Sequence, residues 1–300
     1  MSGSTEPALN STSSVLGPRS SVLGPIRMRL LTTLILLLAL ATPPCVTAQV
    51  SEDSLEASKQ PLFTAEDAFF AGGVIFATIA IVPLDKRLAD ALQGAPQTNR
   101  FFRRVARVVE AIAEPGALLI GGGLYGIGRL AGNERMADLG LHGTEAIIVG
   151  MLLTTAIKVG AGRQRPYVDR DRPHSFAFMR GWNQEQYRSF PSGHALIAFA
   201  AAAAVTNETN RWWPNSVWYI GPAMYGGAAL VALSRMYDNK HWASDVMIGG
   251  LIGTLAGLKV VKYHHTHPDN RVDRWLLGIG LAPEDGGGWV ARPLVMRQRK

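Results

Sequence analysis

The chain has 300 residues, of which 47% are hydrophobic, and a formal net charge of +7. A chain of this length and composition can bury the core of one large domain or of two small ones. Its basic residues are spread along the sequence and its one cysteine is Cys45, which argues against a nucleic-acid-binding patch, a disulfide framework and a zinc–thiolate site.

Residues 1–48 are typical of an export signal. Basic residues precede an apolar stretch of about a dozen residues, and the small residues up to Ala48 fit a cleavage site. Cleavage would remove Cys45 and leave no thiol nucleophile in the mature chain. A retained membrane anchor is the alternative, and a start at Met28 would make residues 1–27 a mis-assigned extension.

Residues 49–62 are polar and are expected to be a linker, and residues 63–262 have the composition of one all-α domain. Apolar, charge-free runs rich in Ala and Leu recur in this domain, with little of the alternation that marks strands. We therefore expect a bundle of about six main helices, together with an amphipathic helix over residues 99–115. The six runs are Ala68–Leu84, Gly116–Gly128, Ala146–Ile157, Ala195–Val205, Trp212–Ser234 and Val246–Leu258.

The length of these runs indicates whether the bundle spans a membrane. Most of them are shorter than the roughly 20 residues that a helix needs to span a bilayer. This favours a bundle that is exported whole to the periplasm, with its apolar helices packed on one another and with membrane contact through exposed apolar faces left open. The alternative is an integral membrane protein with six helices, of which one run fails to cross or to which residues 101–113 add a crossing.

The tail, residues 263–300, has a different composition. Two short apolar stretches flank a Gly-rich turn around residues 284–288, and Pro293 would place the second stretch at an edge, so a small β-hairpin is expected. The histidines of residues 264–267 have the composition of a metal-binding tract, but a polar helix exit is the interpretation that we favour.

Two polar clusters lie where an apolar run meets a loop. In "KVGAGRQRP", Lys158 lies near a helix end and Pro166 keeps Arg165 out of helical geometry, so the two cations can converge on a phosphate. In "FPSGHA", Ser192, Gly193 and His194 start an Ala-rich run, where free N–H groups and the Ser192 hydroxyl can bind an anion. Taken separately, each cluster also has a purely structural interpretation. The first is then a basic helix C-terminus that complements the helix dipole, and the second is a capped helix N-terminus.

A third cluster, "SRMYDNKHWASD", separates the last two apolar runs. His241 and Asp245 are four residues apart, so on a helix they share one face. Asp245 could then accept a hydrogen bond from Nδ1–H of His241 and leave Nε2 free as a nucleophile or base. Arg235 would add a third cation. Taken alone, His241 and Asp245 could equally be an ordinary pair of polar residues on a helix surface.

The three clusters together hold the groups needed for phosphoryl transfer through a phosphohistidine. They resemble the signature of the type 2 phosphatidic acid phosphatase and vanadium haloperoxidase superfamily, over about residues 65–262. The pattern is Lys, six residues, Arg-Pro; then Pro-Ser-Gly-His; then Ser-Arg, five residues, His, three residues, Asp. Its matches are Lys158, Arg165, Pro166, Pro191, Ser192, Gly193, His194, Ser234, Arg235, His241 and Asp245.

The resemblance implies a helical bundle with its active site at one end, and hydrolysis of a phosphomonoester or pyrophosphate on a small molecule or a lipid. It implies His241 as nucleophile, His194 as acid and base, and Asp245 as the residue that orients His241. The implied phosphate-binding residues are Lys158, Arg165, Ser192, Gly193 and Arg235. No metal or other cofactor is expected, vanadate is expected to inhibit, and nucleic acid is not an expected partner.

Other residues and functions remain alternatives. Arg163 is expected to form a supporting salt bridge, and residues 167–190 are expected to roof the site, with His174, Arg180 and Arg188 as unranked candidates. His142 and Glu145 are interpreted as structural. A vanadium-dependent haloperoxidase and a noncatalytic lipid-binding helical module are the alternative functions.

Overall fold

The structure is a computed structural model that describes residues 61–93 and 100–267, residues 270 and 272, and two short strands at 279–283 and 289–293. The expected export signal of residues 1–48 and nearly all of the expected linker lie outside these described residues.

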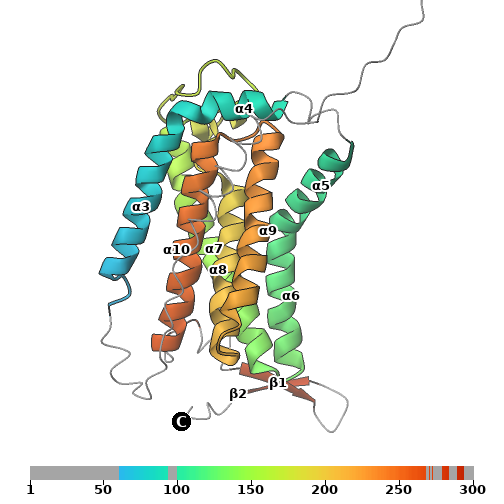
Figure 1. Ribbon diagram of the computed structural model, residues 1–300. Helices are drawn as coiled ribbons and strands as arrows, with labels where there is room; N and C mark the ends of the chain where they lie inside the picture. The colour runs from blue at the N-terminus through green and yellow to red at the C-terminus, as the bar shows by residue number, and fades with distance from the viewer. Residues whose placement is uncertain are drawn as a thin grey trace, which may run out of the picture.

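The described chain forms a helical bundle, which confirms the all-α prediction (Figure 1). Its long helices are α3 (Ala65–Ile81), α6 (Ala117–Leu130), α7 (Glu134–Ala161), α8 (Gly193–Trp212), α9 (Val217–Tyr237) and α10 (Ala243–Thr266). From α6 onward, successive long helices run in opposite directions, so their connections alternate between the two ends of the bundle.

Shorter elements complete the bundle. The helix α4 (Asp85–Gln93) follows the 3-10 turn η1 (Val82–Leu84) and lies across one end of the bundle (Figure 1). The amphipathic helix α5 (Arg100–Ala111) leads through the π-helical turn η3 (Ile112–Gly116) into α6. Because α5 and α6 continue in one direction, residues 101–113 do not form a separate crossing of the bundle.

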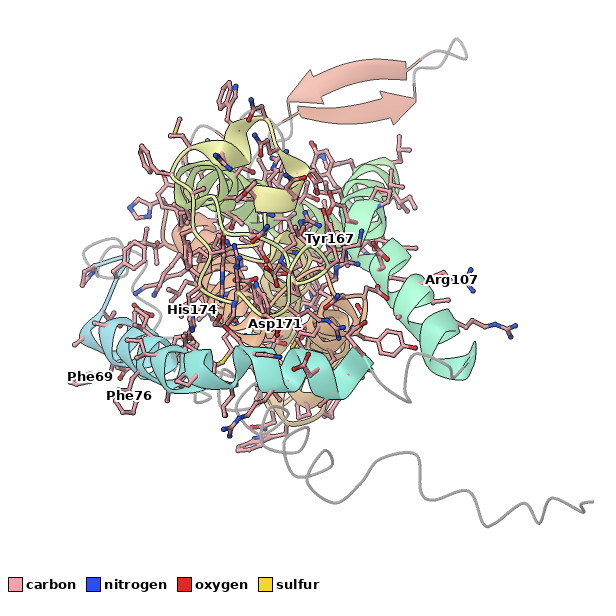
Figure 2. The ribbon with its side chains drawn as sticks, turned by 90° about the horizontal axis from the view of Figure 1, so that it is seen from above. Phe69, Phe76, Arg107, Tyr167, Asp171 and His174 are labelled. Atoms are coloured by element: carbon pink, nitrogen blue, oxygen red, sulfur yellow. The ribbon has the colours of Figure 1, made fainter. Side chains whose placement is uncertain are left out.

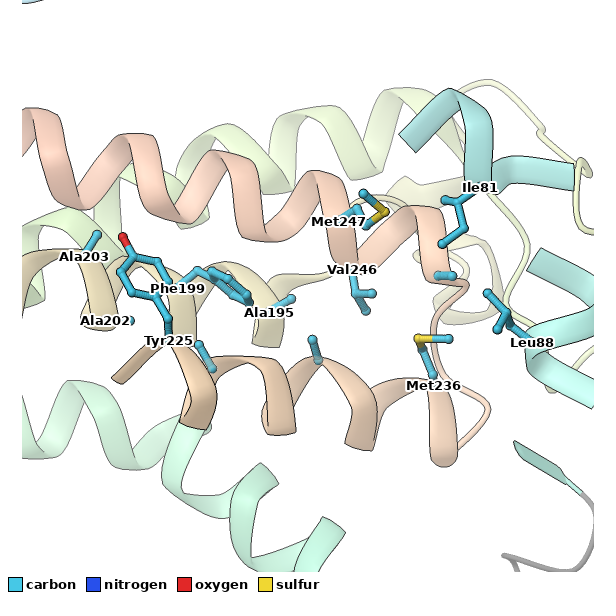
Figure 3. Packing of buried hydrophobic residues seen from close by; sticks show 13 residues of the cluster. Ile81, Leu88, Ala195, Phe199, Ala202, Ala203, Tyr225, Met236, Val246 and Met247 are labelled. Carbon is cyan, nitrogen blue, oxygen red and sulfur yellow. The ribbon is translucent and has the colours of Figure 1, made fainter. Parts of the chain in front are cut away.

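Helix α8 occupies the centre and contacts α7, α9 and α10. Most of its alanines are buried, and Phe199 packs edge to face against Tyr225 of α9 (Figure 3). Helix α10 approaches α8 through Gly249, Gly253 and Gly257, which are spaced one turn apart. A Cβ atom at Gly253 would collide with the carbonyl oxygen of Leu196, so these glycines permit the two backbones to touch.

The expected hairpin is present in the tail. Strands β1 (Ile279–Pro283) and β2 (Trp289–Pro293) pair antiparallel, with Ile279 opposite Pro293 and Pro283 opposite Trp289. The hairpin lies at the end of the bundle opposite α4 (Figure 1).

The helices are longer than the apolar runs from which we predicted them. Helix α7 has 28 residues, because the polar residues from Glu134 to Glu145 and the glycines near its end continue the helix. The prediction that most helices are too short to cross a bilayer is therefore wrong. Five stretches of the described chain are long and apolar enough to cross a membrane: Ala65–Gln93, Ala106–Leu130, Glu134–Ala161, Val217–Tyr237 and Ala243–Thr266.

The outer faces of these helices are apolar and exposed. Phe69 and Phe76 of α3 have exposed fractions of 82% and 75%, and both point away from the bundle (Figure 2). Leu119 of α6 and Leu152 of α7 are each 70% exposed. The expectation that the apolar helices bury their side chains on one another is thus met at α8 but not on the outside of the bundle.

Candidate active site

The three predicted clusters meet at one end of the bundle. Lys158 lies in the last turn of α7, Gly193 begins α8, and the turn between α9 and α10 carries His241. Since α7 and α9 end where α8 and α10 begin, the alternating direction of the helices brings all three clusters to the same end (Figure 1).

The start of α8 forms the floor of the site. The Ser192 hydroxyl caps the helix by accepting a hydrogen bond from the backbone N–H of Ala195. Helix geometry leaves the N–H groups of Gly193 and His194 without intrahelical acceptors. Lys158 faces this helix start, because a Cβ atom placed on Gly193 would lie 3.6 Å from Nζ of Lys158. A helix N-terminus and an ammonium group therefore favour an anion at the same point.

His241 is held by a partner that the sequence did not predict. Its Nδ1 atom lies 2.6 Å from the backbone carbonyl oxygen of Ser189 but 3.8 Å from Oδ2 of Asp245. A carbonyl oxygen can only accept, so Nδ1 carries the proton and Nε2 has the free lone pair. Nε2 is thus unprotonated, as we predicted. The predicted hydrogen bond from Nδ1–H to Asp245 is wrong, because the Ser189 carbonyl oxygen takes that place.

The physical reason is that His241 and Asp245 do not lie on one helix. Helix α10 begins at Ala243, and His241 precedes it. Asp245 lies in the first turn, where its Oδ2 accepts hydrogen bonds from the backbone N–H of Trp242 and from the Ser189 hydroxyl. A carboxylate in the first turn is favourable because it meets free N–H groups there.

Burial makes His241 a neutral base. The side chain is only 3% exposed, and desolvation lowers the pKa of its imidazole to about 3, with the nearby cations Lys158 and Arg165 acting in the same direction. Neutral imidazole is the form that can attack an electrophile.

A buried ion-pair network lies behind Asp245. Arg163 donates through Nη1 to Oδ1 of Asp245 and through Nη2 to Oδ2 of Asp85 at 2.8 Å, and the two carboxylates are completely buried. Ser244 links them further by accepting from Arg163 at 2.7 Å and donating to Asp85 at 2.6 Å. Arg163 thus forms the supporting salt bridge that we expected, and α4 is connected to the α9–α10 turn.

Two further arginines converge on the same end. Arg165 pairs with Glu185, and Arg235 pairs with Glu110 at 2.7 Å. The guanidinium groups are almost buried, whereas both carboxylates are more than a third exposed. The Nε atoms of Arg165 and Arg235 are buried and have no hydrogen-bond partner within the described part of the chain. Burial lowers the pKa of Arg165, and nearby Arg235 and Arg188 act in the same direction, so several cations share this space.

His194 lies at the mouth of the site. Its imidazole is 19% exposed, with Nδ1 3.4 Å from Glu114 and Nε2 4.0 Å from Glu110. His241, by contrast, is buried. The arrangement thus places one partly exposed histidine and one buried histidine among three cations, which is suited to an acid and a nucleophile acting on a phosphoryl group.

Residues 141–269 match the PAP2 superfamily, and this segment contains all three clusters. We therefore assign this segment of the chain to the PAP2 superfamily. It is 42% identical over 69 residues to a lipid A 1-phosphatase of Porphyromonas gingivalis, covering 23% of this chain and 15% of that protein. It is 28% identical over 137 residues to an undecaprenyl-diphosphatase of Sulfolobus acidocaldarius, covering 44% of this chain and 63% of that protein.

A third PAP2 relative is a probable diacylglycerol pyrophosphate phosphatase of Schizosaccharomyces pombe, 28% identical over 157 residues, which cover 43% of this chain and 55% of that protein. The chain therefore spans less than two thirds of the length of each of these three curated relatives. No solved structure matches the chain.

The loop that follows α7 covers the PAP2 site. Gly162 ends α7 with a positive φ of 56°, and a Cβ there would collide with the carbonyl oxygen of Ala177. Tyr167, Asp171 and His174 of this loop lie over the end of the bundle (Figure 2). The loop therefore roofs the site as expected.

The unranked roof candidates lie in different surroundings. His174 and Arg180 are exposed, and Arg180 stacks on Tyr187 with its Cζ 5.2 Å from the ring centroid. Arg188 is partly buried, and its Nη1 is 3.9 Å from Glu185. Of the three, Arg188 is the one near the cation cluster.

Sequence reasoning missed four residues that shape the PAP2 site: Ser189, Asp85, Ser244 and Glu110. Ser189 and Ser244 adjoin the signature, so their position beside it was an available signal. Asp85 and Glu110 lie far from the signature in sequence, and only the packing of α4 and α5 against the site end brings them close.

Proposed function

We propose that the chain is a metal-independent phosphatase that hydrolyses a phosphomonoester or pyrophosphate through a phosphohistidine on His241. The observation that carries the proposal is the hydrogen bond from Nδ1 of His241 to the carbonyl oxygen of Ser189. It leaves Nε2 unprotonated at the end of the bundle where Lys158, Arg165 and Arg235 converge.

The cations would bind the nonbridging oxygens of the phosphoryl group. Arg165 and Arg235 each have a buried Nε–H group available as a donor. Lys158 and the N–H groups at Gly193 and His194 supply charge and donors at the start of α8, where Ser192 keeps the helix capped. Fixed donors of this kind stabilise the charge that the transferring group carries in the transition state.

The reaction would proceed in two displacements. Nε2 of His241 attacks phosphorus, the bond to the leaving oxygen breaks, and His194 gives that oxygen a proton. His194 then takes a proton from water, which attacks the phosphohistidine, and the P–N bond breaks to release phosphate and restore neutral His241. Asp245 keeps its negative charge throughout and holds Ser189 and Arg163 in place.

We further propose that the substrate is a phosphorylated lipid. Support comes from the exposed apolar faces of α3, α6 and α7, and from relatives named for lipid A, undecaprenyl diphosphate and diacylglycerol pyrophosphate. A site at the end of an apolar bundle would receive a headgroup while the acyl or prenyl chain stays in the bilayer.

The same observations support an integral membrane protein over the exported bundle that the run lengths favoured. Large aliphatic and aromatic side chains on the outside of long helices are favourable in lipid and costly in water. The compartment into which the site opens is a separate matter, because cleavage and retention of residues 1–48 would both start the bundle on the outer side, and the outcome then depends on how many helices cross the membrane.

The phosphoenzyme is the direct test. The purified chain is mixed with a ³²P-labelled lipid phosphate, quenched in alkaline denaturant because a P–N bond is labile in acid, and digested for mass spectrometry. Label is expected on His241, with none in His241→Ala and slower formation and decay in His194→Ala. Label on a serine or aspartate, or full turnover by His241→Ala, would refute the mechanism.

Two inhibitors test the role of metal. The initial rate should survive EDTA, because protein cations replace a metal clamp, and vanadate should inhibit by occupying the phosphoryl position. A rate that EDTA abolishes and added Mg²⁺ restores would contradict a metal-independent reaction.

A further inference from the structure

A second polar cluster lies at the opposite end of the PAP2 bundle. It is formed by His142 of α7, Glu208 of α8 and His265 of α10. His142 and Glu208 are buried and His265 is nearly so, with side-chain exposures of 2%, 0% and 11%. Three separate helices therefore bring ionisable groups to one point inside the bundle.

The cluster is far from the proposed active site. His142 and Lys158 are 16 positions apart on α7, which corresponds to about 24 Å along a helix. Glu208 and His194 are 14 positions apart on α8, or about 21 Å. The cluster and the active site thus cannot share a ligand, and the cluster needs an explanation of its own.

The ligand atoms lie at hydrogen-bonding distances from one another, which is closer than the ligands of a tetrahedral zinc ion, so the side chains would move slightly apart to admit one. Nδ1 of His142 lies 2.5 Å from Oε1 of Glu208, and Nε2 of His265 lies 3.0 Å from both oxygens of the same carboxylate. All the potential ligand atoms fall within 4.8 Å of one another. Two imidazole nitrogens and one carboxylate are a set that binds zinc with a further position open to water.

The charge of the cluster also favours a bound cation. Glu208 has no exposed surface, and among the described residues no lysine or arginine pairs with it. A buried carboxylate is costly unless it is paired or coordinates a metal, and its two imidazole partners bring a positive charge only when protonated. A divalent cation would compensate the carboxylate without requiring either histidine to be charged.

A second layer of contacts orients the cluster. The ring of His264 stacks on that of His142 with centroids 4.2 Å apart. Nε2 of His264 is in turn 2.6 Å from Oε2 of Glu145, one turn along α7 from His142. Fixed outer contacts of this kind are typical of metal sites, where they hold the ligand rings in orientation.

We propose that His142, Glu208 and His265 bind one divalent transition-metal ion of the zinc type, which fastens α7, α8 and α10 together at this end of the bundle. Each histidine coordinates through the nitrogen that now faces Glu208, and its proton moves to the other ring nitrogen. The site is structural and takes no part in the phosphatase reaction that we propose.

Metal binding to the full-length chain tests the proposal. The protein is purified in detergent without a polyhistidine tag, stripped with a chelator, and titrated with Zn²⁺ by calorimetry, with metal content measured by mass spectrometry. One Zn²⁺ per chain is expected, together with a rise in the unfolding temperature. Replacement by Co²⁺ should give the intense visible absorption of a four-coordinate ion.

Matched variants locate the ion. His265→Gln, at the least buried ligand, should weaken Zn²⁺ binding about tenfold or more, and Glu208→Gln should do the same if that variant folds. His267→Gln, two residues away on the same chain segment and outside the cluster, should bind Zn²⁺ as the wild type does.

The outcomes are independent of the active site. The initial rate of His265→Gln should equal that of the wild type, whatever the phosphoenzyme experiment shows for His241. Wild-type protein that takes up no stoichiometric Zn²⁺, or a His265→Gln variant with undiminished affinity, would overturn the proposal and leave the cluster as a hydrogen-bond network only.

Discussion

The backbone carbonyl oxygen of Ser189 accepts a hydrogen bond from Nδ1 of His241 at 2.6 Å. The side chain of Ser189 meanwhile donates to Asp245, which Arg163 also binds. The imidazole is therefore oriented by the main chain, and Asp245 acts on it by fixing the segment that carries that main-chain carbonyl.

This relationship predicts different outcomes for two substitutions. Ser189→Ala keeps the carbonyl group and loses one hydrogen bond to Asp245, so kcat should fall about five- to tenfold, in line with about 1 kcal/mol. Asp245→Asn removes one of the two buried carboxylate charges that Arg163 binds and should destabilise the fold by about 3–5 kcal/mol. Its loss of kcat should also be far larger. Thermal unfolding and initial rates of the two purified variants measure the losses of stability and of kcat. Equal losses of kcat would argue against orientation of His241 by the Ser189 carbonyl oxygen.

The second prediction concerns two aspartates of α4: Asp85, its first residue, and Asp90, five residues later. Asp85→Asn removes one partner of the buried Arg163, so the free energy of unfolding should fall by about 3–5 kcal/mol, and kcat should fall with KM little changed. Asp90→Asn is the matched control, because its pair with Lys86 is 44% exposed on the aspartate side and such pairs contribute about 0–1 kcal/mol. Equal unfolding temperatures for the two variants would contradict a role for Asp85 through Arg163.

The third prediction concerns pH. Burial lowers the pKa of His241 from 6.5 to about 3, so the nucleophile stays neutral as the pH falls from 7 to 4. The unfolded chain gains a proton at this residue below pH 6.5, so His241 lowers the stability of the fold progressively between pH 6.5 and 3. The profile of kcat/KM should be measured with two phosphate esters whose own second pKa values differ. An acidic limb that stays near pH 6.5 with both esters would show that His241 titrates normally.

The fourth prediction concerns the contact between α8 and α10. Gly253→Ala places a methyl group against the carbonyl oxygen of Leu196, and such overpacking should cost about 1–3 kcal/mol or more. Gly226→Ala in α9 is the control, since nothing lies within 4 Å of its added Cβ, and there the higher helix propensity of alanine should be neutral or stabilising. Unfolding temperatures in one detergent compare the two, and an undisturbed Gly253→Ala variant would be inconsistent with backbone contact.

The fifth prediction concerns the exposed apolar faces. The chain should remain in the membrane pellet after an alkaline carbonate wash and be released by detergent, because Phe69, Phe76 and Leu152 would lie in lipid. Release of the folded chain by carbonate would instead support an exported, non-spanning bundle, which the lengths of the apolar runs favoured.

The sequence alone determined the helical class and the proposed chemistry of one end of the bundle. Lys158, His194 and His241 could be placed together in advance, because each lies beside the end of an apolar run and consecutive antiparallel helices return to the same end. The hairpin of the tail was also predictable, since turn residues between two short apolar stretches act locally.

The tertiary structure decided what depends on contacts between distant segments. The lengths of the helices exceeded those of the apolar runs because polar residues and glycines continue a helix once its neighbours are packed. Asp85 reaches Arg163 across 78 positions, and His142 reaches Glu208 across 66. Neither pair has a local signature, because such contacts are fixed by how α4, α7 and α8 lie against one another. Hydrogen-bond partners are set in the same way, which is why Ser189, and not Asp245, holds His241.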